Sequence, residues 1–249
     1  MIYAWNRRTD AALTSPFFDF PNDSAEQPFV IAQLGQSLDG RIATPTGDSK
    51  YINGDAALDH LHAIRAHVDA VLVGVGTVVA DDPLLTVRRV PGRSPARVIL
   101  DPNGRMPRDA RVLADDGVRR ILVCGPEAPP VPGAERLALA VGPAGLPPHG
   151  ILRALGALGL RRILVEGGAR TISTFVDAGA VDRLHILMAP IILGSGRTGL
   201  DLAPIGPLSQ ALRPRTRAYV LPDGDVLFDC DLRAQAGDEP CRETALAGV

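Results

Sequence analysis

The sequence is poor in aromatic residues and in cysteine, and both shortages limit the classes of protein to which it can belong. Aromatic side chains make up 4% of the 249 residues, so the 46% hydrophobic content consists mainly of aliphatic side chains, which favours an aliphatic α/β core. The three cysteines, Cys124, Cys230 and Cys241, lie far apart along the chain. This spacing fits a reduced cytoplasmic protein better than a disulfide framework or a zinc site, and we expect no metal.

Strong charge and long apolar runs are also missing. The formal net charge is -2 without any block of basic residues, so the electrostatic footprint of a nucleic-acid-binding protein is absent. No apolar run approaches the roughly 20 residues that cross a bilayer. The first residues lack the basic region and apolar stretch of a secretory signal. We therefore expect a cytoplasmic protein with a small-molecule partner and with neither a nucleic-acid nor a membrane partner.

Apolar runs separated by helical patterns predict a mostly parallel central sheet. The runs fall at 29–34, 70–75, 96–101, 119–124, 137–141 and 161–167. Most lack polar alternation, as expected for strands covered on both faces. Helices are predicted at about 55–68, with Asn53 or Asp55 as cap, and at about 77–81, 147–158 and 169–179. Strands that alternate with helices are typical of an α/β fold with flanking helices.

The two ends of the chain differ from this body, which we place at residues 29–232. From Arg183 onward, apolar segments separated by turns predict antiparallel C-terminal strands. Residues 1–28 are expected to form an irregular N-terminal arm, whose segment Phe17–Phe20 packs on the body or on a partner subunit. Residues 233–249 have little apolar content, which predicts a disordered tail.

Two predicted strands end in glycine turns. In "LVEGGARTIS", Gly167 and Gly168 lie between a strand and a helix, where free backbone N–H groups and the helix dipole favour an anion. In "LVGVGTVVADDP", two glycines precede Thr77 and Asp81. Such turns after two parallel strands would suit the phosphates of a dinucleotide, although tight or capped structural turns explain the same residues. The usual G-x-G-x-x-G fingerprint is absent.

Two charged residues lie within apolar sequence patterns, where a solvent-exposed side chain is not expected. Arg65 shares the helical stripe of Leu58, Leu61 and Val68, so it needs an anion or a carbonyl as partner unless its stem reaches the surface. Glu166 ends an apolar run at the point where open α/β sheets place their chemistry, although a charge at a helix start is the simpler alternative.

Two long segments resemble the pyrimidine reductase domain of riboflavin biosynthesis. "PFVIAQLGQSLDGRIATPTGDSKYINGDAALDHLHAIRAHVDAVLVGVGTVVADDPLLTVR" resembles its start, and "RRILVEGGARTISTFVDAGAVDRLHILMAPIILGSG" resembles its second half. The resemblance covers about residues 28–232. It implies a dihydrofolate-reductase-like fold, a homodimer, and an NADPH-dependent oxidoreductase of the kind that acts on CH-OH donors. It also implies that the ribosyl group of a phosphoribosylamino-pyrimidine is reduced to ribityl.

The resemblance also assigns roles to individual residues. It matches the substrate positions to Gln33, Ser49, Arg65, Leu85, Arg88 and Glu166. In these positions the two arginines would bind phosphate, and Glu166 would be the catalytic residue that orients or protonates the amino-sugar. It matches the cofactor positions to Gly35, Tyr51, Thr77, Asp81, Gly167, Gly168, Ala169, Arg170, Thr171, Ile172, Ser173 and Thr174. The polar loop Ser37–Asp55 would then line the substrate and nicotinamide pocket.

The sequence departs from the family pattern in ways that leave alternatives open. It contains no H-x-E and no P-C-x-x-C pattern, so we expect no deaminase activity. Gln33 stands where relatives usually have Lys, which removes a charge from the substrate site, and Tyr51 stands where they have Trp. The alternatives are a paralogous reductase for another pterin or pyrimidine, such as dihydrofolate, and a non-catalytic protein that binds NADPH or a flavin precursor.

Overall fold

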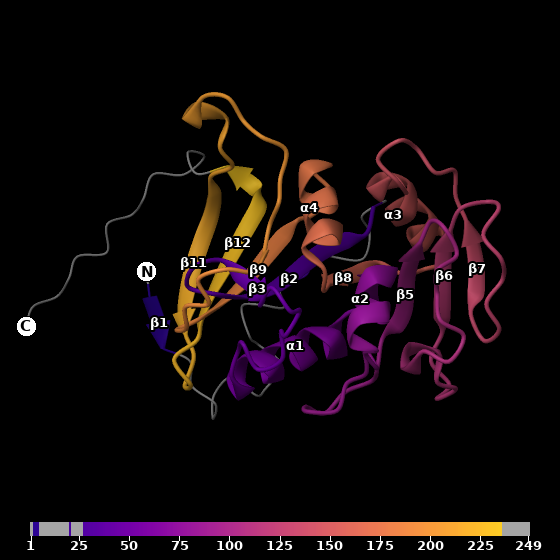
Figure 1. Cartoon of the computed structure of the whole chain (residues 1–249), viewed down its shortest axis with the longest axis horizontal. Coiled ribbons are helices and arrows are strands. Elements are labelled where there is room, and N and C mark those ends of the chain that lie inside the picture. Colours follow the sequence, from indigo (N-terminus) through magenta and orange to yellow (C-terminus); the bar gives the residue numbers. More distant parts are fainter. Residues whose placement is uncertain (1, 5–19, 21–26, 236–249) are drawn as a thin grey trace, which may run out of the picture.

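A single large sheet organises the molecule. The computed structural model describes residues 2–4, 20 and 27–235. Within them, ten strands follow the order β1-β11-β12-β9-β2-β8-β4-β5-β6-β7 (Figure 1). Their bounds are β1 Ile2–Ala4, β2 Phe29–Ser37, β4 Ala70–Gly74, β5 Ala96–Asp101, β6 Arg120–Cys124, β7 Glu135–Ala138, β8 Arg162–Glu166, β9 Arg183–Ala189, β11 Pro214–Val220 and β12 Val226–Gln235. A second, two-stranded sheet pairs β3 (Arg41–Ala43) with β10 (Arg197–Thr198).

The strand directions confirm the predicted fold class. Parallel pairing runs from β9 through β2, β8, β4, β5 and β6 to β7. The C-terminal strands β9, β12 and β11 pair antiparallel, as expected from Arg183 onward. The last parallel strand begins two residues earlier than the predicted run 137–141. It is an exposed edge strand, so its residues need not be apolar.

Helices cover both faces of the sheet because its strands are apolar on both sides. The α-helices are α1 (Asp55–His67), α2 (Val75–Asp81), α3 (Pro148–Ala157) and α4 (Ala169–Asp177), and the 3₁₀ turns are η2 (Arg111–Leu113) and η3 (Leu208–Gln210). In β2, Val30 and Ala32 belong to the core that α3 and α4 complete, whereas Ile31 belongs to the core of α1 and α2. This alternation confirms the interpretation of uninterrupted apolar runs as doubly covered strands.

The N-terminal segment is partly structured. We expected residues 1–28 to be irregular, but β1 pairs in parallel with Ala218–Val220 of β11. A three-residue strand has too few residues for a periodic pattern, so no local signal could reveal it. Phe20 packs edge-on against Phe29, with ring centroids 5.7 Å apart, whereas Phe17, Phe18 and Asp19 lie outside the described residues. At the other end, β12 continues to Gln235, and the rest of the predicted tail is not described.

The sheet topology brings several strand ends together. The strands β2, β8, β4 and β5 are neighbours and run parallel, so their carboxyl ends meet along one edge. The loop after β2 and the starts of α2 and α4 lie at this edge. In the part of the chain that the structure describes, no helix has the length and apolar character needed to cross a bilayer.

Candidate active site

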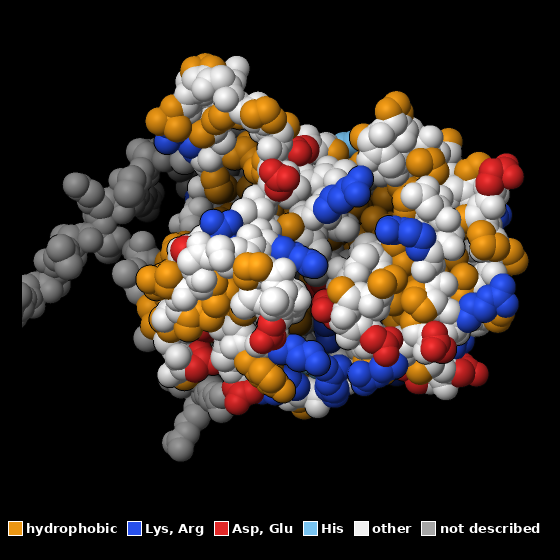
Figure 2. All heavy atoms as spheres, viewed as in Figure 1, with side chains coloured by type: hydrophobic (Ala, Val, Ile, Leu, Met, Phe, Trp, Pro, Cys, Tyr) orange, Lys and Arg blue, Asp and Glu red, His pale blue; other side chains and the backbone are white. Residues whose placement is uncertain are grey.

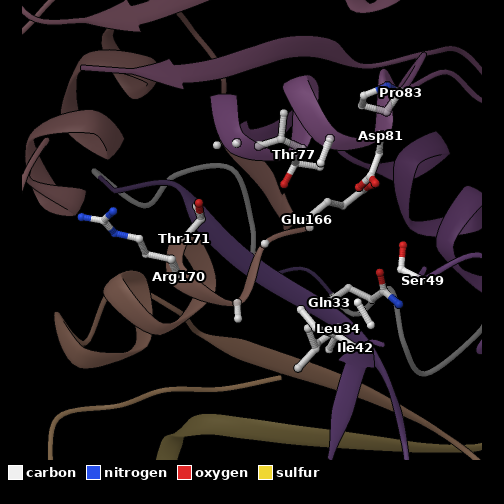
Figure 3. A pocket seen from close by; sticks show the side chains of 18 of the residues that line it. Gln33, Leu34, Ile42, Ser49, Thr77, Asp81, Pro83, Glu166, Arg170 and Thr171 are labelled. Carbon is white, nitrogen blue, oxygen red and sulfur yellow. The ribbon is translucent and has the colours of Figure 1, made fainter. Parts of the chain in front are cut away.

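A cleft of about 990 Å³ opens at the carboxyl ends of the central strands (Figures 2 and 3). Its walls come from β2, the loop after it, the starts of α2 and α4, and the segment after β5. Most residues singled out in the sequence line it: Gln33, Gly35, Ser49, Tyr51, Arg65, Thr77, Asp81, Leu85, Glu166, Gly167, Gly168, Ala169, Arg170, Thr171 and Thr174. The fold therefore gathers residues from segments far apart in the sequence into one cavity.

Three of the singled-out residues do not line the cleft. Ile172 is fully buried in the core, and the Oγ atom of buried Ser173 accepts a hydrogen bond from the Asp201 N–H at 2.9 Å. Consecutive side chains of a helix point in different directions, so a run of consecutive residues cannot all face the cavity. The side chains of Ile172 and Ser173 point away from it. Arg88 is exposed, and its guanidinium donates to Oγ1 of Thr86 at 3.3 Å.

The two glycine turns interlock at the centre of the cleft. Gly167 has φ +71°, and a Cβ atom there would lie 2.9 Å from Cγ2 of Thr77. In the other direction, a Cβ atom on Gly74 would lie 2.6 Å from Oγ1 of Thr171. The threonine of each helix start therefore occupies the space that the glycine of the other turn leaves free. Neither turn can accept a side chain without moving its neighbour.

Arg65 and Glu166 form a buried, two-pronged ion pair. Arg65 donates from Nε to Oε1 of Glu166 at 2.6 Å and from Nη2 to Oε2 at 2.5 Å, and its Nη1 donates to the Thr86 carbonyl at 3.1 Å. The two residues are 6% and 5% exposed. Burial acts to lower the pKa of Arg65, but the charge and hydrogen bonds of Glu166 outweigh it and raise that pKa. Arg65 thus binds both an anion, Glu166, and a carbonyl, that of Thr86, the kinds of partner expected for an arginine on an apolar stripe.

Gln33 lies beside this ion pair. It is the parallel-sheet partner of Glu166 on the neighbouring strand, so the two side chains emerge on the same side of the sheet. Gln33 is 8% exposed and lines the cleft, and within the described residues its amide makes no hydrogen bond. A lysine at this position would put a second cation next to Glu166. The neutral amide leaves Arg65 as the cation in contact with this carboxylate.

The polar loop after β2 is fixed at its far end. The Asn53 amide donates to the Leu187 carbonyl at 3.2 Å and to Oδ2 of Asp225 at 3.1 Å. The N–H of Ala56 donates to Oδ2 of Asp223 at 2.8 Å, so this aspartate caps α1. The expected cap by Asn53 or Asp55 is therefore wrong, because a carboxylate from the turn between β11 and β12 takes that place. Tyr51, next to this anchor, is 88% exposed and has φ +65°.

His62 connects α1 to the segment that carries Arg88. Its Nδ1 accepts a hydrogen bond from the Arg88 N–H at 3.1 Å, which requires that nitrogen to be unprotonated. Burial, together with the charges of Arg65, Arg88 and Arg89, lowers the pKa of His62 to about 4. The imidazole is therefore neutral at physiological pH. Helical spacing alone did not predict this hydrogen bond, because His62 accepts it from a backbone N–H 26 residues away.

The cleft also holds arginines that the sequence did not single out. Arg105 and Arg197 line it together with Arg170, and within the described residues none of the three has an acidic partner. The acidic side chains that line it, within the same residues, are Asp81 and Glu166. In Figure 3, Arg170 extends away from Asp81, Glu166 and Ser49. No group of His, Cys, Asp or Glu suited to a metal ion occurs in the described part of the chain.

Comparisons with known proteins find relatives over most of the chain. The family model of the RibD C-terminal domain matches residues 28–213. The 2,5-diamino-6-ribosylamino-4(3H)-pyrimidinone 5′-phosphate reductase of Methanothermobacter thermautotrophicus is 38% identical over 205 residues, which cover 78% of this chain and 94% of that protein. The riboflavin biosynthesis protein RibD of Aquifex aeolicus is 36% identical over 211 residues, which cover 82% of this chain and 57% of that protein.

A solved structure extends the likeness to three dimensions. The diaminohydroxyphosphoribosylaminopyrimidine deaminase/5-amino-6-(5-phosphoribosylamino)uracil reductase of Thermotoga maritima matches with a TM-score of 0.71 and 31% identity, over 83% of this chain and 57% of that one. The chain thus spans just over half the length of the Aquifex and Thermotoga proteins. The architecture is the dihydrofolate-reductase-like one that the sequence resemblance implied. The chain belongs to the RibD C-terminal domain family, and the relatives compared with it include reductases of ribosylaminopyrimidine phosphates.

Proposed function

We propose that the protein is an NADPH-dependent reductase of riboflavin biosynthesis that converts the ribosyl group of a phosphorylated ribosylaminopyrimidine to ribityl. The observation that carries the proposal is the cleft itself. It joins two interlocked glycine turns, suited to a dinucleotide, with a buried carboxylate held by an arginine, suited to a polar substrate. A small-molecule site with these two halves in one cavity fits a reaction between a cofactor and a substrate.

The residues present fit a nicotinamide dinucleotide. The turns at Gly74 and Gly167 bring backbone to the wall of the cavity beside two helix starts, where free backbone N–H groups favour an anion such as a diphosphate. Thr77 and Thr171 flank the turns with hydroxyl groups. We assign the cofactor to Gly35, Tyr51, Thr77, Asp81, Gly167, Gly168, Ala169, Arg170, Thr171 and Thr174, with Ile172 and Ser173 contributing through their helix and not through their side chains.

The chemistry needs a hydride donor and an electrophilic carbon held together. A bound NADPH supplies a hydride and its two electrons. In the ring-opened imine form of the substrate, C1′ would take the hydride and the attached nitrogen would take a proton from solvent water, which would yield the ribitylamino group. The protein positions the two partners. Glu166, fixed at both oxygens by Arg65, would accept hydrogen bonds from the amino-sugar and orient it. This pairing favours the orienting role of Glu166 over that of a proton donor.

The substrate phosphate is assigned to the arginine that Glu166 does not engage. Arg65 directs three of its donors at Glu166 and the Thr86 carbonyl. Within the described residues, the Arg88 guanidinium donates to a threonine hydroxyl and has no acidic partner. We therefore propose Arg88 as the main phosphate ligand, with Arg65 as an additional one through its remaining donors. We also assign Ser49 and Leu85, which line the cleft, to the substrate.

The test is reductase activity of the purified full chain. NADPH consumption should follow addition of 2,5-diamino-6-ribosylamino-4(3H)-pyrimidinone 5′-phosphate or of its uracil counterpart, and mass spectrometry should find the ribityl product. The absence of turnover with both compounds, under conditions where NADPH binds, would overturn the proposal. Binding of NADPH without any turnover would support a non-catalytic binding protein.

Gln33 motivates a second candidate, a reductase for another pterin or pyrimidine. The missing cation beside Glu166 changes the charge that the site offers to a substrate. Dihydrofolate belongs in the same assay for this reason. Gln33→Lys distinguishes the two candidates: it should preserve or raise activity on the ribosylaminopyrimidine phosphate if that is the substrate, and should lower activity on dihydrofolate if that compound is preferred.

A further inference from the structure

Asn53 is a cleft residue that the assignments above leave without a role. The sequence suggested it as a cap of α1, but Asp223 takes that place. Asn53 lines the cleft from the end of the polar loop, two positions before α1 begins. Its side chain lies against Gly35, because a Cβ atom added to that glycine would collide with Oδ1 of Asn53. The amide therefore forms part of the cleft wall at a position that we assign to the cofactor.

Two hydrogen bonds determine which way the Asn53 amide points. Its Nδ2 donates to the Leu187 carbonyl at 3.2 Å and to Oδ2 of Asp225 at 3.1 Å. A carbonyl and an ionised carboxylate only accept hydrogen bonds, so the nitrogen must face them, and both of its protons are used. Oδ1 is left on the side of Gly35, and within the described residues it accepts no hydrogen bond. The cleft wall thus presents one oriented acceptor to a ligand.

Asp225 is the residue that holds this orientation. It is 2% exposed and ends the turn between β11 and β12. Its Oδ2 also accepts a hydrogen bond from the Gly54 N–H at 2.9 Å, so one carboxylate binds both the side chain of Asn53 and the backbone after it. The turn is closed by a hydrogen bond from the Leu221 N–H to the Asp225 carbonyl at 2.8 Å. A buried carboxylate on a closed turn keeps its position, as the support of a recognition residue requires.

The place of Oδ1 selects the kind of donor that it can meet. Gln33 and Glu166, which we assign to the substrate, lie one pleat back from Gly35 toward the start of the strands. Gly35 itself is assigned to the cofactor, whose nicotinamide ring carries a carboxamide with an NH₂ donor. We propose that Oδ1 of Asn53 accepts a hydrogen bond from this carboxamide, and that Asp225 is the positioning residue that orients Asn53 for it. The inference rests on the proposed cofactor site and adds two residues to it.

The competing account is that Asn53 and Asp225 only anchor the loop. The same turn already provides one such anchor, because Asp223 accepts the Ala56 N–H at 2.8 Å. An anchor needs only the donors of the Asn53 amide, whereas recognition needs its Oδ1. Loss of an anchor should weaken every ligand of the cleft by the same factor. Loss of the acceptor should weaken only a ligand that carries the matching donor, so the two accounts predict different results.

The experiment measures binding and not turnover. Calorimetric titrations of the full chain would compare NADP⁺ with its 3-acetylpyridine analogue, in which a methyl group replaces the carboxamide NH₂ and cannot donate. The quantity of interest is the ratio of the two Kd values. Asn53→Ala removes the acceptor, and Asp225→Asn keeps the shape of the side chain but adds a donor, so that the Asn53 amide can turn over. Asp223→Asn is the matched control, because it changes a carboxylate of the same turn that caps α1 instead.

The wild type should bind the analogue about 5- to 30-fold more weakly than NADP⁺, the loss expected when a buried acceptor is left unpaired. Asn53→Ala should bring the ratio close to one, Asp225→Asn should lower it, and Asp223→Asn should retain it. Equal binding of the two compounds by the wild type would overturn the inference without the need for any variant. A ratio that persists in Asn53→Ala would also overturn it, and one that persists in Asp225→Asn would refute the positioning role. A wild-type chain that binds neither compound would contradict the proposed function itself.

Discussion

At the scale of single residues, the ion pair of Arg65 and Glu166 is the most consequential interaction in the cleft. Two charges that are 6% and 5% exposed have lost most of their hydration, and their mutual hydrogen bonds compensate for that loss. Removing one partner leaves the other as a buried, unpaired charge, so the pair supports the fold as well as the site. This dual role separates Arg65 from Arg88, which is exposed and whose guanidinium donates to the Thr86 hydroxyl.

Arg65→Met should therefore lower the free energy of unfolding by about 3–5 kcal/mol, as for a buried pair that loses one partner. The double variant Arg65→Met with Glu166→Gln should recover part of this loss, because neither charge is then left unpaired. The same non-additivity should appear in kcat/KM, since both residues act through one carboxylate. Chemical denaturation and steady-state kinetics of the four proteins form the double-mutant cycle. Purely additive losses would mean that the two residues act independently.

His62 makes stability depend on pH. Its pKa is lowered to about 4 in the folded chain, from an ordinary value of 6.5. Between about pH 6.5 and about pH 4 the unfolded chain binds a proton that folded His62 does not, so stability should be complete above this window and fall as the pH is lowered through it. Protonation would also abolish the acceptor for the Arg88 N–H.

The measurement for His62 is the free energy of unfolding across this pH window. His62→Asn keeps an acceptor near the position of Nδ1 but does not titrate, so it should show a shallower decline than the wild type. The decline should not vanish, because the pKa of buried His60 is also lowered by burial and by His185. His149→Asn, at an exposed position, is the control and should retain the wild-type slope. Equal slopes in the wild type and His62→Asn would contradict the role of His62.

At the scale of elements, the two interlocked strand–helix turns determine whether the cleft keeps its shape. Gly167→Ala introduces a side chain at φ +71° and places its Cβ 2.9 Å from Thr77. Gly133 offers a matched control, because it has φ +83° and a Cβ atom added there would have no neighbour within 4 Å. Both alanine variants should lose about 1–2 kcal/mol of stability from backbone strain. Only Gly167→Ala should also weaken NADPH binding in a calorimetric titration; equal binding by the two variants would contradict this account.

Local patterns in the sequence predicted the strands and helices that are long enough to show a periodic pattern. The apolar runs predicted the parallel strands, and the stripe of Leu58, Leu61 and Val68 predicted that Arg65 turns inward. The short strands β3 and β10 carry no periodic pattern, so no local signal could predict them. The capping of α1 by Asp223 joins groups 167 residues apart, a distance over which spacing carries no information.

In the candidate site, too, local sequence signals predicted some features, and contacts between distant residues determine the others. Glycine after an apolar strand is a local signal, and both Gly167 and Gly168 line the cleft. The pairing of Arg65 with Glu166 spans 101 residues, and only the packing of α1 against β8 produces it. Arg105 stands in an ordinary turn sequence, "PNGR", whose chemistry does not differ from that of any other turn. Its access to the cleft follows from the strand order, which local sequence does not reveal.

At the scale of the whole molecule, the C-terminal half carries exposed apolar side chains. Ile192 and Leu208 are each 74% exposed and Leu212 is 58% exposed, and all three belong to the long excursion between β9 and β11. Figure 1 shows this excursion rising beyond the ends of β11 and β12, and Figure 2 shows hydrophobic atoms on its surface. The edge of β11 is partly covered, because β1 pairs with Ala218–Val220 of this strand. The excursion is therefore the better candidate for a subunit contact.

We predict that the protein is a homodimer in which a second copy covers this excursion, because clustered apolar side chains on a monomer mark interaction surfaces. Light scattering at micromolar concentration should give a mass near twice 26.2 kDa. Leu208→Asp with Leu212→Asp should shift the mass toward that of the monomer, since burying the new carboxylates in an apolar contact is unfavourable. Leu158→Asp, at an exposed position after α3, should leave the dimer intact. A wild-type mass near 26.2 kDa would contradict the dimer, and a dimer that survives both Asp substitutions would place the contact elsewhere.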